Sequence, residues 1–381
     1  MERDVARTAR SGMSRAVAAS LLAAALCGCS APARQGGAME WVRLSPDGRC
    51  FCLQPSGRPY TPWGFNYDHD ANGTLLEDYW HRRWPAVEGD FREMRRLGAN
   101  VVRIHLQLGR FMAGPAEPNQ AALDRLGELV VLAEREGLYL NVTGLGCYHK
   151  ADVPAWYDTL DERRRWEVQG RFWEAVARRC AASPAIFCYD LMNEPVVPGG
   201  TGKRDDWLGP PFAGKCFVQF IALETAGRKR PQIARAWTAQ LVAAIRKHDR
   251  GHLVTVGLVP WSLDRPGLTS GFVPSEIASE LDFLAIHIYP ERGNPAEAMD
   301  TLRGFAACGK PVVIEEIFPL MCGLDELGQF IDQSRPLACG WIGFYWGKPP
   351  EELRPPKSIG EALTLQWLEY FANQAKARKA G

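Results

Sequence analysis

The sequence predicts an α/β protein built as a closed (β/α)8 TIM barrel. Short apolar runs typical of buried strands alternate with amphipathic stretches typical of helices along most of the chain. About eight such strand–helix units follow one another between residues 62 and 375, and strict alternation of this kind implies a parallel sheet. Eight units suit a sheet that closes on itself, with the carboxyl ends of its strands gathered at one mouth.

The predicted strands are apolar runs bounded by turn residues. They span residues 62–67, 100–106, 138–145, 185–193, 253–259, 281–289, 311–317 and 340–346. The clearest helices span residues 89–97, 120–136, 163–179, 231–248, 301–307, 324–333 and 359–375. An open doubly wound sheet is the alternative, but such a sheet normally carries a glycine-rich phosphate loop after its first strand. Here Asp68-His69-Asp70-Ala71-Asn72 follows that strand.

Two further segments complete the predicted barrel domain, which spans residues 40–381. Residues 41–60 contain the turn signal Ser45-Pro46-Asp47-Gly48 between short alternating runs, which predicts an N-terminal β-hairpin that plugs one end of the barrel. Residues 196–230 form a long connection between the fourth strand and its helix. Loops of this length in a compact domain are usually functional, so we expect a lid or a cleft wall, with an inert insertion as the alternative.

Length and charge narrow the classes of function. The chain has 381 residues, 46% of them hydrophobic, which is enough for one large core. Lys and Arg number 45 against 44 Asp and Glu, so nothing favours nucleic acid as a partner. The 13 Trp pack in the core or line a sugar cleft, where indole faces stack on pyranose rings. Nothing in the sequence indicates an oligomer, and a monomer is the default expectation.

The first 30 residues predict a signal for export. Arg3, Arg7, Arg10 and Arg15 precede an apolar run over residues 16–26, followed by Cys27-Gly28-Cys29. A basic region, a short apolar region and small residues are typical of a secretory signal. Residues 26–29 resemble a bacterial lipoprotein box with Cys29 as the lipidated residue, and residues 31–39 form a linker. We therefore expect a membrane-anchored lipoprotein, periplasmic or at the cell surface, or else a secreted protein.

The cysteines predict thiols or disulfides rather than a metal centre. Nine of the eleven remain after Cys27 and Cys29, and export would permit disulfides. Cys50 and Cys52 fall on one face of the hairpin by alternation, whereas Cys188 lies in a predicted core strand. No group of Cys and His has the spacing of a zinc site. We expect no structural metal and no cofactor.

Two carboxylates stand at the ends of predicted strands. Asn193-Glu194-Pro195 closes the fourth apolar run, and Glu315-Glu316 ends the seventh. The carboxyl ends of barrel strands face the active site. Two carboxylates on two strand ends are what cleavage of a glycosidic bond requires.

The order of these motifs resembles the cellulase-like family 5 glycoside hydrolases, within the retaining (β/α)8 clan. The residues that carry the resemblance are Gly98-Ala99-Asn100-Val101-Val102-Arg103, Asn193-Glu194-Pro195, His287-Ile288-Tyr289, Glu315-Glu316 and Trp346. They fall in order on successive predicted strand ends, and the resemblance covers roughly residues 40–376.

The resemblance implies a catalytic role for two glutamates. Glu194 corresponds to the general acid/base, and Glu316 to the nucleophile that attacks the anomeric carbon. Retention of configuration requires the two carboxyl groups about 5–5.5 Å apart. Glu315 stays open as the alternative nucleophile, because strand alternation turns only one of the two adjacent glutamates into the mouth. The other is expected to pair with a cation in the helix layer.

The resemblance also implies five substrate-site residues. Asn193 is expected to bind the sugar 2-hydroxyl, which a kinked or bulged strand end would permit beside Glu194. Arg103 is expected to orient the nucleophile, and Tyr289 to donate a hydrogen bond to it. His287 lies two residues before Tyr289, hence on the same face, and would contact the sugar or the acid/base. Trp346 is expected to form a platform under the sugar.

The sequence departs from the family pattern at two places. The third strand usually ends in a site histidine, but Gly144 and Leu145 occupy that position, and His149 or His105 is the candidate substitute. Residues 317–319 after the nucleophile also differ from the usual aromatic and glycine. Further aromatic candidates for the cleft are Trp63, Tyr67, Trp156, Trp207 and Trp261.

The leading hypothesis is therefore an O-glycosyl hydrolase that acts on a β-linked glucan, mannan or related oligo- or polysaccharide by double displacement. A catalytically degenerate sugar-binding lipoprotein on the same barrel is the alternative. A metal-dependent barrel hydrolase or lyase is the third, but its only candidate motif, Tyr67-Asp68-His69-Asp70, lacks the necessary ligand spacing.

Overall fold

The computed structural model describes residues 38–265, 269–344 and 346–380. The predicted signal, lipid-attachment site and most of the linker lie outside the described residues. The compact unit that holds the barrel spans Met39–Gly381.

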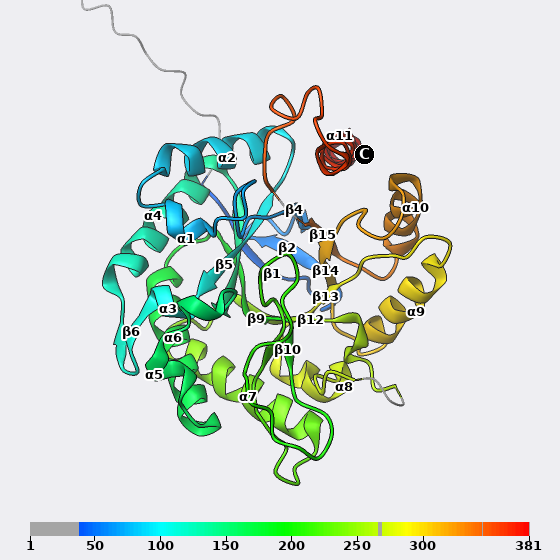
Figure 1. Cartoon of the computed structure of the whole chain (residues 1–381). Helices are drawn as coiled ribbons and strands as arrows, with labels where there is room; N and C mark the ends of the chain where they lie inside the picture. The colour runs from blue at the N-terminus through cyan, green and yellow to red at the C-terminus, as the bar shows by residue number, and fades with distance from the viewer. Residues whose placement is uncertain (1–37, 266–268, 345, 381) are drawn as a thin grey trace, which may run out of the picture. The chain divides into compact units, whose positions relative to one another are not determined.

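Eight strands close into a barrel in which every neighbouring pair is parallel (Figure 1). In chain order they are β4 (Trp63–Asn66), β5 (Val101–Gln107), β8 (Tyr139–Gly146), β9 (Ile186–Asn193), β12 (Leu253–Leu258), β13 (Leu284–His287), β14 (Val312–Ile317) and β15 (Gly340–Gly343). The first and last of these, β4 and β15, pair with each other and close the barrel. The predicted (β/α)8 fold is confirmed.

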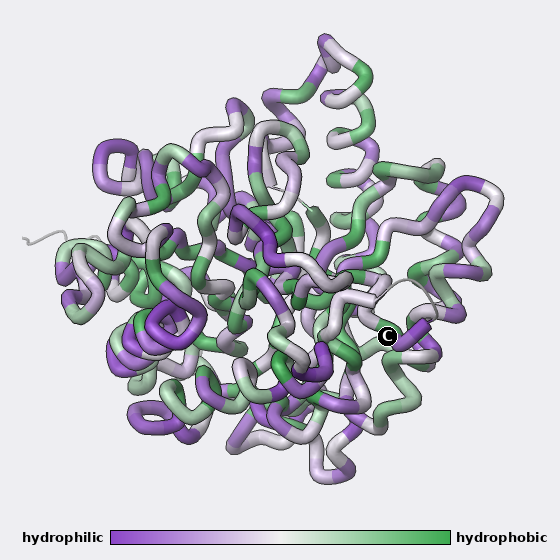
Figure 2. The backbone as a smooth tube through the Cα atoms, turned by 60° about the horizontal axis from the view of Figure 1, so that its bottom comes forward, coloured by the Kyte–Doolittle hydropathy of each residue, from purple (hydrophilic) through white to green (hydrophobic). Residues whose placement is uncertain are grey.

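Helices surround the strands, and hydrophilic residues are frequent on them and on their connecting turns (Figure 2). The long helices are α2 (Trp84–Arg96), α4 (Gln120–Glu136), α6 (Glu162–Cys180), α7 (Arg230–Arg246), α9 (Pro295–Ala306), α10 (Leu324–Ser334) and α11 (Ile359–Ala380). Short helices are α1 (Leu76–Tyr79), α3 (Leu108–Phe111), α5 (Ala155–Asp158) and α8 (Pro274–Ile277), and 3-10 turns span Lys150–Asp152, Pro260–Ser262 and Ala278–Glu280. Within the part of the chain that the structure describes, no helix is long and apolar enough to cross a membrane.

Local signals explain why helix α4 has the predicted bounds. The Asn119 side chain accepts a hydrogen bond from the Ala121 backbone, and Gly137 ends the helix with a left-handed φ of 67°. An asparagine cap and a left-handed glycine are strong start and stop signals. Most of the apolar residues between them face the core on one side, and Val131 is exposed.

The N-terminal segment forms a three-stranded antiparallel sheet rather than a simple hairpin. Its strands are β1 (Trp41–Leu44), β2 (Phe51–Gln54) and β3 (Pro59–Tyr60). Phe51 and Tyr60 pack into a buried cluster with residues at the starts of the barrel strands. Those residues are Val101, Tyr139, Phe187, Leu253, Phe283, Val313 and Cys339. The sheet therefore closes the amino-terminal base of the barrel, opposite the mouth.

The long connection after β9 lies over the mouth. Its first residues form β10 (Pro195–Val196), which pairs with β11 (Gln219–Phe220) further along the same connection. A bridge between Phe212 and Lys215 makes a tight turn between them. A second small hairpin, β6 (Met112–Gly114) with β7 (Glu117–Pro118), follows α3.

Candidate active site

The end of β9 is kinked at Glu194. This residue has a φ of 46°, a left-handed backbone that is uncommon for a residue other than glycine. Its backbone N–H donates to the Gly257 carbonyl at 3.0 Å, and the pairing of β9 with β12 shifts register just before that glycine. The kink allows the side chains of Asn193 and Glu194 to reach the same end of the barrel. Such strain concentrates at functional sites.

Glu316 lies at the mouth between a phenol and a guanidinium. The Tyr289 hydroxyl donates to Glu316 Oε2 at 2.7 Å, and Arg103 Nη1 donates to Oε1 at 2.8 Å. Both carboxylate oxygens are thus fixed by one partner each. The structure brings together Arg103, Tyr289 and Glu316, the three residues that sequence reasoning grouped around a nucleophile.

Glu315 also points into the barrel, so the expectation that it pairs with a cation in the helix layer is wrong. Its Oε1 lies 3.5 Å from Arg103 Nε and accepts a hydrogen bond from Asn141. The cause is a register shift where His287 pairs with Glu316, while Ile286 pairs with Ile314. That bulge makes Glu315 the extra residue, so two adjacent side chains face inward.

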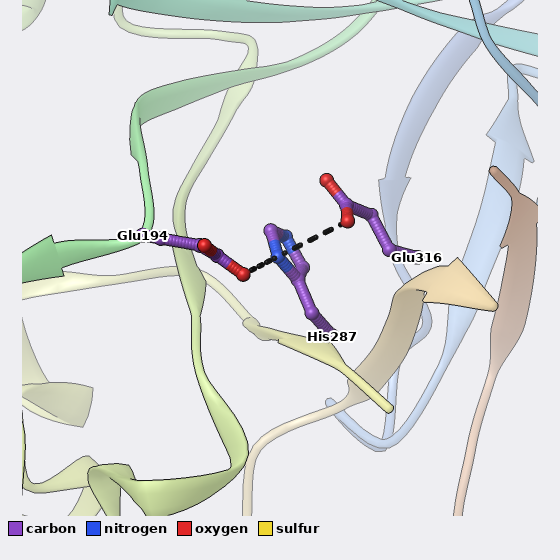
Figure 3. A group of neighbouring side chains, drawn as sticks. All are labelled: Glu194, His287 and Glu316. Carbon is purple, nitrogen blue, oxygen red and sulfur yellow. Dashed lines mark hydrogen bonds and ion pairs between the residues drawn. The ribbon is translucent and has the colours of Figure 1, made fainter. Parts of the chain in front are cut away.

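His287 stands between the two candidate catalytic glutamates (Figure 3). Its Nδ1 is 3.0 Å from Glu194 Oε1 and 3.5 Å from Glu316 Oε2. One carboxylate oxygen of Glu194, one of Glu316 and this ring nitrogen all lie within 4.8 Å of one another. The imidazole comes from β13, between the strands that carry the two carboxylates.

Arg103 is a fully buried cation that binds several groups at once. Besides Glu316, its guanidinium donates to Asp190 Oδ2 at 2.8 Å, Asn193 Oδ1 at 3.0 Å and Asn66 Oδ1 at 2.9 Å. Sequence reasoning missed Asp190 and Asn66. A signal was present, because Asp190 is a charged residue inside a buried strand, and such residues are almost always paired.

The charges at the mouth shift one another's protonation. Burial lowers the pKa of His287, but the Glu316 carboxylate, the hydrogen bond with Glu194 and the Glu315 carboxylate 3.7 Å away raise it to about 10. Burial raises the pKa of Glu316, the nearby Glu194 adds to the rise, and the His287 and Arg103 cations oppose it. Burial and the Glu315 charge raise the pKa of Asp190 to about 6. His287 is therefore an imidazolium at neutral pH and donates its Nδ1 proton to a carboxylate.

His105 and His149 are the candidate substitutes for the absent third-strand histidine. His105 on β5 is buried, with Nδ1 hydrogen-bonded to the Tyr148 hydroxyl and Nε2 3.2 Å from Asn66 Oδ1. His149, the other candidate substitute, begins the turn Lys150–Asp152 and is only partly buried. Of the two histidines, His105 is the one whose hydrogen bonds connect to the site.

A cavity of about 150 Å³ opens onto both glutamates. Its other lining residues are Pro210, Phe212, Phe217, Val218, Tyr289, Leu320 and Phe344. The long connection after β9 supplies the first four, so it forms a wall of the candidate site. Asn193 lies beneath this wall, because its Nδ2 donates to the Phe217 carbonyl at 3.2 Å.

Trp346, the predicted aromatic platform, is not among the residues that line the cavity. Trp346 is fully buried against Phe65, and its indole N–H donates to Asp90 Oδ1 at 2.9 Å. Among the described residues, Phe344 is the aromatic from the end of β15 that lines the cavity. Trp63, Tyr67, Trp156, Trp207 and Trp261, the other aromatic candidates, are not among the residues that line it.

The same glutamates and His287 are the group of described residues whose donor atoms have the spacing of metal ligands. A metal ion there would compete with the proton on His287 Nδ1, since a coordinating imidazole must be neutral. The expectation that the protein needs no metal or cofactor stays a prediction.

Fold and site together define a TIM-barrel protein with two neighbouring glutamates at the carboxyl end of its strands. The chain belongs to glycosyl hydrolase family 5, since the family model described as cellulase matches residues 62–320. A mannan endo-1,4-beta-mannosidase A from Podospora anserina is 28% identical over 221 residues, which cover 51% of this chain and 50% of that protein.

Solved structures show the same fold. An exo-beta-1,4-mannosidase from Opitutaceae bacterium strain TAV5 superposes with a TM-score of 0.64 at 17% identity, covering 88% of this chain and 62% of that one. A GH5_18 protein from Bifidobacterium longum subsp. infantis gives a TM-score of 0.60 at 17% identity, with 83% and 79% covered. The chain thus spans about half of the Podospora protein and under two thirds of the Opitutaceae chain.

Proposed function

We propose that this protein is a retaining β-glycoside hydrolase that cleaves a β-linked mannan, glucan or related oligo- or polysaccharide. One observation carries the proposal: an oxygen of Glu194 and an oxygen of Glu316 lie within 4.8 Å of each other. Double displacement requires carboxyl groups about 5–5.5 Å apart, whereas direct displacement by water requires about 6.5–9.5 Å. The short separation of these two oxygens supports double displacement.

Each glutamate has one role in the proposed reaction. Glu316 attacks the anomeric carbon as Glu194 protonates the departing oxygen, which leaves a glycosyl ester on Glu316 and an alcohol product. Glu194, now a carboxylate, removes a proton from water, and the hydroxide oxygen displaces Glu316. The hydrogen bonds from Tyr289 and Arg103 hold the attacking carboxylate in one orientation.

The environment of Glu315 supports Glu316 as the nucleophile. Glu315 is fully buried beneath the mouth and bound by Arg103 and Asn141, whereas Glu316 lines the cavity. A carboxylate without access to the cavity has no route to an anomeric carbon.

Mannose-containing substrates come first in the proposal because of the names of the relatives. The Podospora protein is a mannan endo-mannosidase, and one similar structure is a mannotriose complex of a Thermomonospora fusca β-mannanase. Asn193 is proposed to bind the 2-hydroxyl, the position at which mannose and glucose differ. Its Nδ2 donates one N–H to the Phe217 carbonyl, which leaves the second N–H of the amide for that hydroxyl.

The test is a mechanism-based label. A 2-deoxy-2-fluoro-β-mannosyl fluoride should trap an ester on Glu316, which peptide mass spectrometry locates. Glu194→Gln and Glu316→Gln should each lower turnover of β-mannooligosaccharides by at least about 10³-fold, while the surface variant Glu280→Gln should match the wild type. An ester on Glu315, or an inverted anomer as the first product by NMR, contradicts the proposed mechanism.

A sugar-binding protein without turnover is the second candidate. The absent third-strand histidine and the altered residues 317–319 after Glu316 favour it. Calorimetry separates the two candidates: a binding protein keeps its affinity for mannooligosaccharides in Glu316→Gln and shows no products with either form.

We also propose that the chain is exported and lipidated at Cys29. Metabolic labelling with a fatty acid in a bacterial host should mark the wild type and the control variant Cys27→Ser, and should fail in Cys29→Ser. Label that persists in Cys29→Ser contradicts this attachment site.

A further inference from the structure

Two cysteines that are far apart in the sequence meet at the base of the barrel. Cys339 directly precedes β15, and its backbone N–H donates to the Val312 carbonyl at 2.7 Å. Its thiol donates to the Arg49 carbonyl at 2.9 Å, across a sequence separation of 290 residues. The next residue along the chain is Cys50.

The turn before Cys50 is held firmly. The backbone N–H of Ser45 donates to the Cys50 carbonyl at 2.9 Å, and the Cys50 N–H donates to Ser45 Oγ at 3.0 Å. On the other side, Phe51 is buried in the same cluster as Cys339 and contacts the rings of Phe187 and Phe283. Cys50 therefore has anchored neighbours on both sides, and little backbone movement can carry it away from Cys339.

Cys339 Sγ lies against the peptide unit that joins Arg49 to Cys50, and the two cysteines differ in accessibility. Burial and a hydrogen bond with the Cys50 thiol raise the pKa of Cys339 to about 12. Cys339 is buried, whereas Cys50 is exposed. An oxidant from solution can therefore react with Cys50 first. The Cys339 thiol can then attack the oxidised Cys50 and complete the disulfide.

We propose that Cys50 and Cys339 are a site of disulfide formation that locks the N-terminal sheet to the last strand of the barrel. With a small disulfide such as oxidised glutathione as the oxidant, the Cys50 thiolate attacks one sulfur and releases one glutathione thiolate. The Cys339 thiolate then attacks the Cys50 sulfur of the mixed disulfide and releases the second. Two protein thiols are oxidised, one disulfide is reduced to two thiols, and two protons leave the protein.

The bond crosses the place where the barrel closes. Strand β15 pairs with β4, the first barrel strand, and the N-terminal sheet directly precedes β4. A bridge from Cys50 to Cys339 would enclose nearly the whole barrel in one covalent loop. Long loops lose the most chain entropy in the unfolded state, so the oxidised protein should melt roughly 4–8 °C above the reduced one.

Peptide mapping tests the pairing. The full chain is incubated with oxidised glutathione, blocked with iodoacetamide and digested with trypsin and chymotrypsin without reductant. Cleavage after Arg49 and after Phe51 separates Cys50 from Cys52, and cleavage after Leu337 and Trp341 isolates Cys339. A linked pair of these two peptides, lighter by two hydrogens than the free peptides together, is the expected result.

Cys52→Ser is the matched control, because Cys52 lies two residues away and its thiol points to the Leu44 carbonyl at 3.5 Å. It should keep both the linked peptides and the higher melting temperature, whereas Cys50→Ser should lose both. Cys50 is exposed, so its replacement leaves the core intact. Because the second step requires the Cys339 thiolate, the rate of disulfide formation should rise about tenfold per pH unit near neutrality.

Two outcomes overturn the proposal. One is a folded, oxidised protein in which Cys50 and Cys339 are both recovered as alkylated free thiols. The other is a link from Cys339 to Cys52 that survives in Cys50→Ser. Neither outcome depends on glycosidase activity, so the test stands apart from the proposed function.

Discussion

The mouth and the base of this barrel differ in what they bury: charged side chains at the mouth and apolar side chains at the base. At the base, Phe51 meets the rings of Phe187 and Phe283 at centroid distances of 5.1 and 5.3 Å, edge to face, within an apolar cluster. At the mouth, one buried guanidinium, Arg103, is in contact with Asp190, Glu315 and Glu316. Burial of apolar surface stabilises the base. At the mouth, charged side chains are removed from water, which costs free energy.

Buried carboxylates show the same difference at the scale of single groups. Asp249, beside the start of β12, accepts hydrogen bonds from Tyr189, from the His252 ring and from two backbone N–H groups. Burial raises its pKa, but these donors outweigh burial and hold the pKa well below the usual range. At the mouth, Glu315 Oε2 has no hydrogen-bond partner among the described residues, and the His287 ring lies 3.7 Å away. Buried polar atoms without hydrogen-bond partners are tolerated where reactivity is selected over stability.

The largest effect expected at the mouth follows from removing its cation. Arg103→Met removes the buried cation that three buried carboxylates share, so we expect a loss of about 3–5 kcal/mol in the free energy of unfolding at pH 7 and no measurable turnover. The carboxyls of the variant should take up protons on folding, so its stability should rise as the pH falls. Urea unfolding at pH 5 and pH 7 measures both expectations.

The matched control is an arginine in an exposed ion pair. Arg235 contacts Glu280 at 3.0 Å on the surface, and Arg235→Met should change stability by less than about 1 kcal/mol at either pH. If Arg103→Met is no less stable than this control, the contrast between mouth and base is wrong.

The base should give the second largest effect, in stability alone. Phe51→Ala removes a ring from the cluster that closes the barrel, which should lower the free energy of unfolding by about 3–4 kcal/mol. Its kcat on mannooligosaccharides, measured well below the melting temperature, should match the wild type. Loss of kcat in a folded Phe51→Ala protein would show that the base is coupled to the chemistry at the mouth.

The sequence was sufficient where local signals act alone. Helix α4 has the predicted bounds because its cap and its terminal glycine are adjacent to it in the chain. The strand ends that carry Glu194 and Glu316 were predictable because buried strands have a visible apolar pattern.

Tertiary geometry decided what the sequence could not show. Alternation predicts opposite faces for Glu315 and Glu316, but a bulge set by the pairing of β13 with β14 turns both inward. The bond from Asn193 to the Phe217 carbonyl joins residues of a strand and a loop, with no periodic pattern in the loop. Such features depend on barrel closure and on loop packing, which one strand's sequence does not contain.

The third expected effect is a pH dependence caused by Glu77, a second incompletely satisfied carboxyl on the mouth side. Burial raises its pKa to about 8, against about 4.3 when unfolded. Between these values the folded state holds a proton that the unfolded state has lost, so stability falls as pH rises from about 5 to 8. Glu77→Gln should remove this slope and stabilise the protein at pH 8 by on the order of 3 kcal/mol.

Thermal unfolding at pH 5 and pH 8 compares Glu77→Gln with the control Glu128→Gln, an exposed residue of α4. The control should keep the slope of the wild type. Equal slopes in all three proteins would mean that Glu77 is ionised in the folded state.

The smallest expected effect on activity comes from a tyrosine at the mouth, and the same substitution of a tyrosine at the base is its control. Tyr289→Phe removes the hydroxyl that donates to Glu316 at 2.7 Å. A hydrogen bond to a charged group contributes about 1.5–3 kcal/mol, so kcat/KM should fall roughly 10- to 100-fold. The loss of a partner for a buried carboxylate should also raise the pKa of Glu316, which moves the acid limb of the kcat/KM profile to higher pH.

Tyr139→Phe is the corresponding change at the base, where the hydroxyl donates to the Glu40 carbonyl at 2.7 Å. It should cost about 1 kcal/mol of stability and leave the pH profile of kcat/KM in place. A shifted acid limb is the decisive readout, because a merely structural role for Tyr289 would lower stability without moving it. If both variants keep the wild-type profile, the hydroxyl of Tyr289 does not control the charge on Glu316, and the contrast between the two ends of the barrel rests on Arg103 and Glu77.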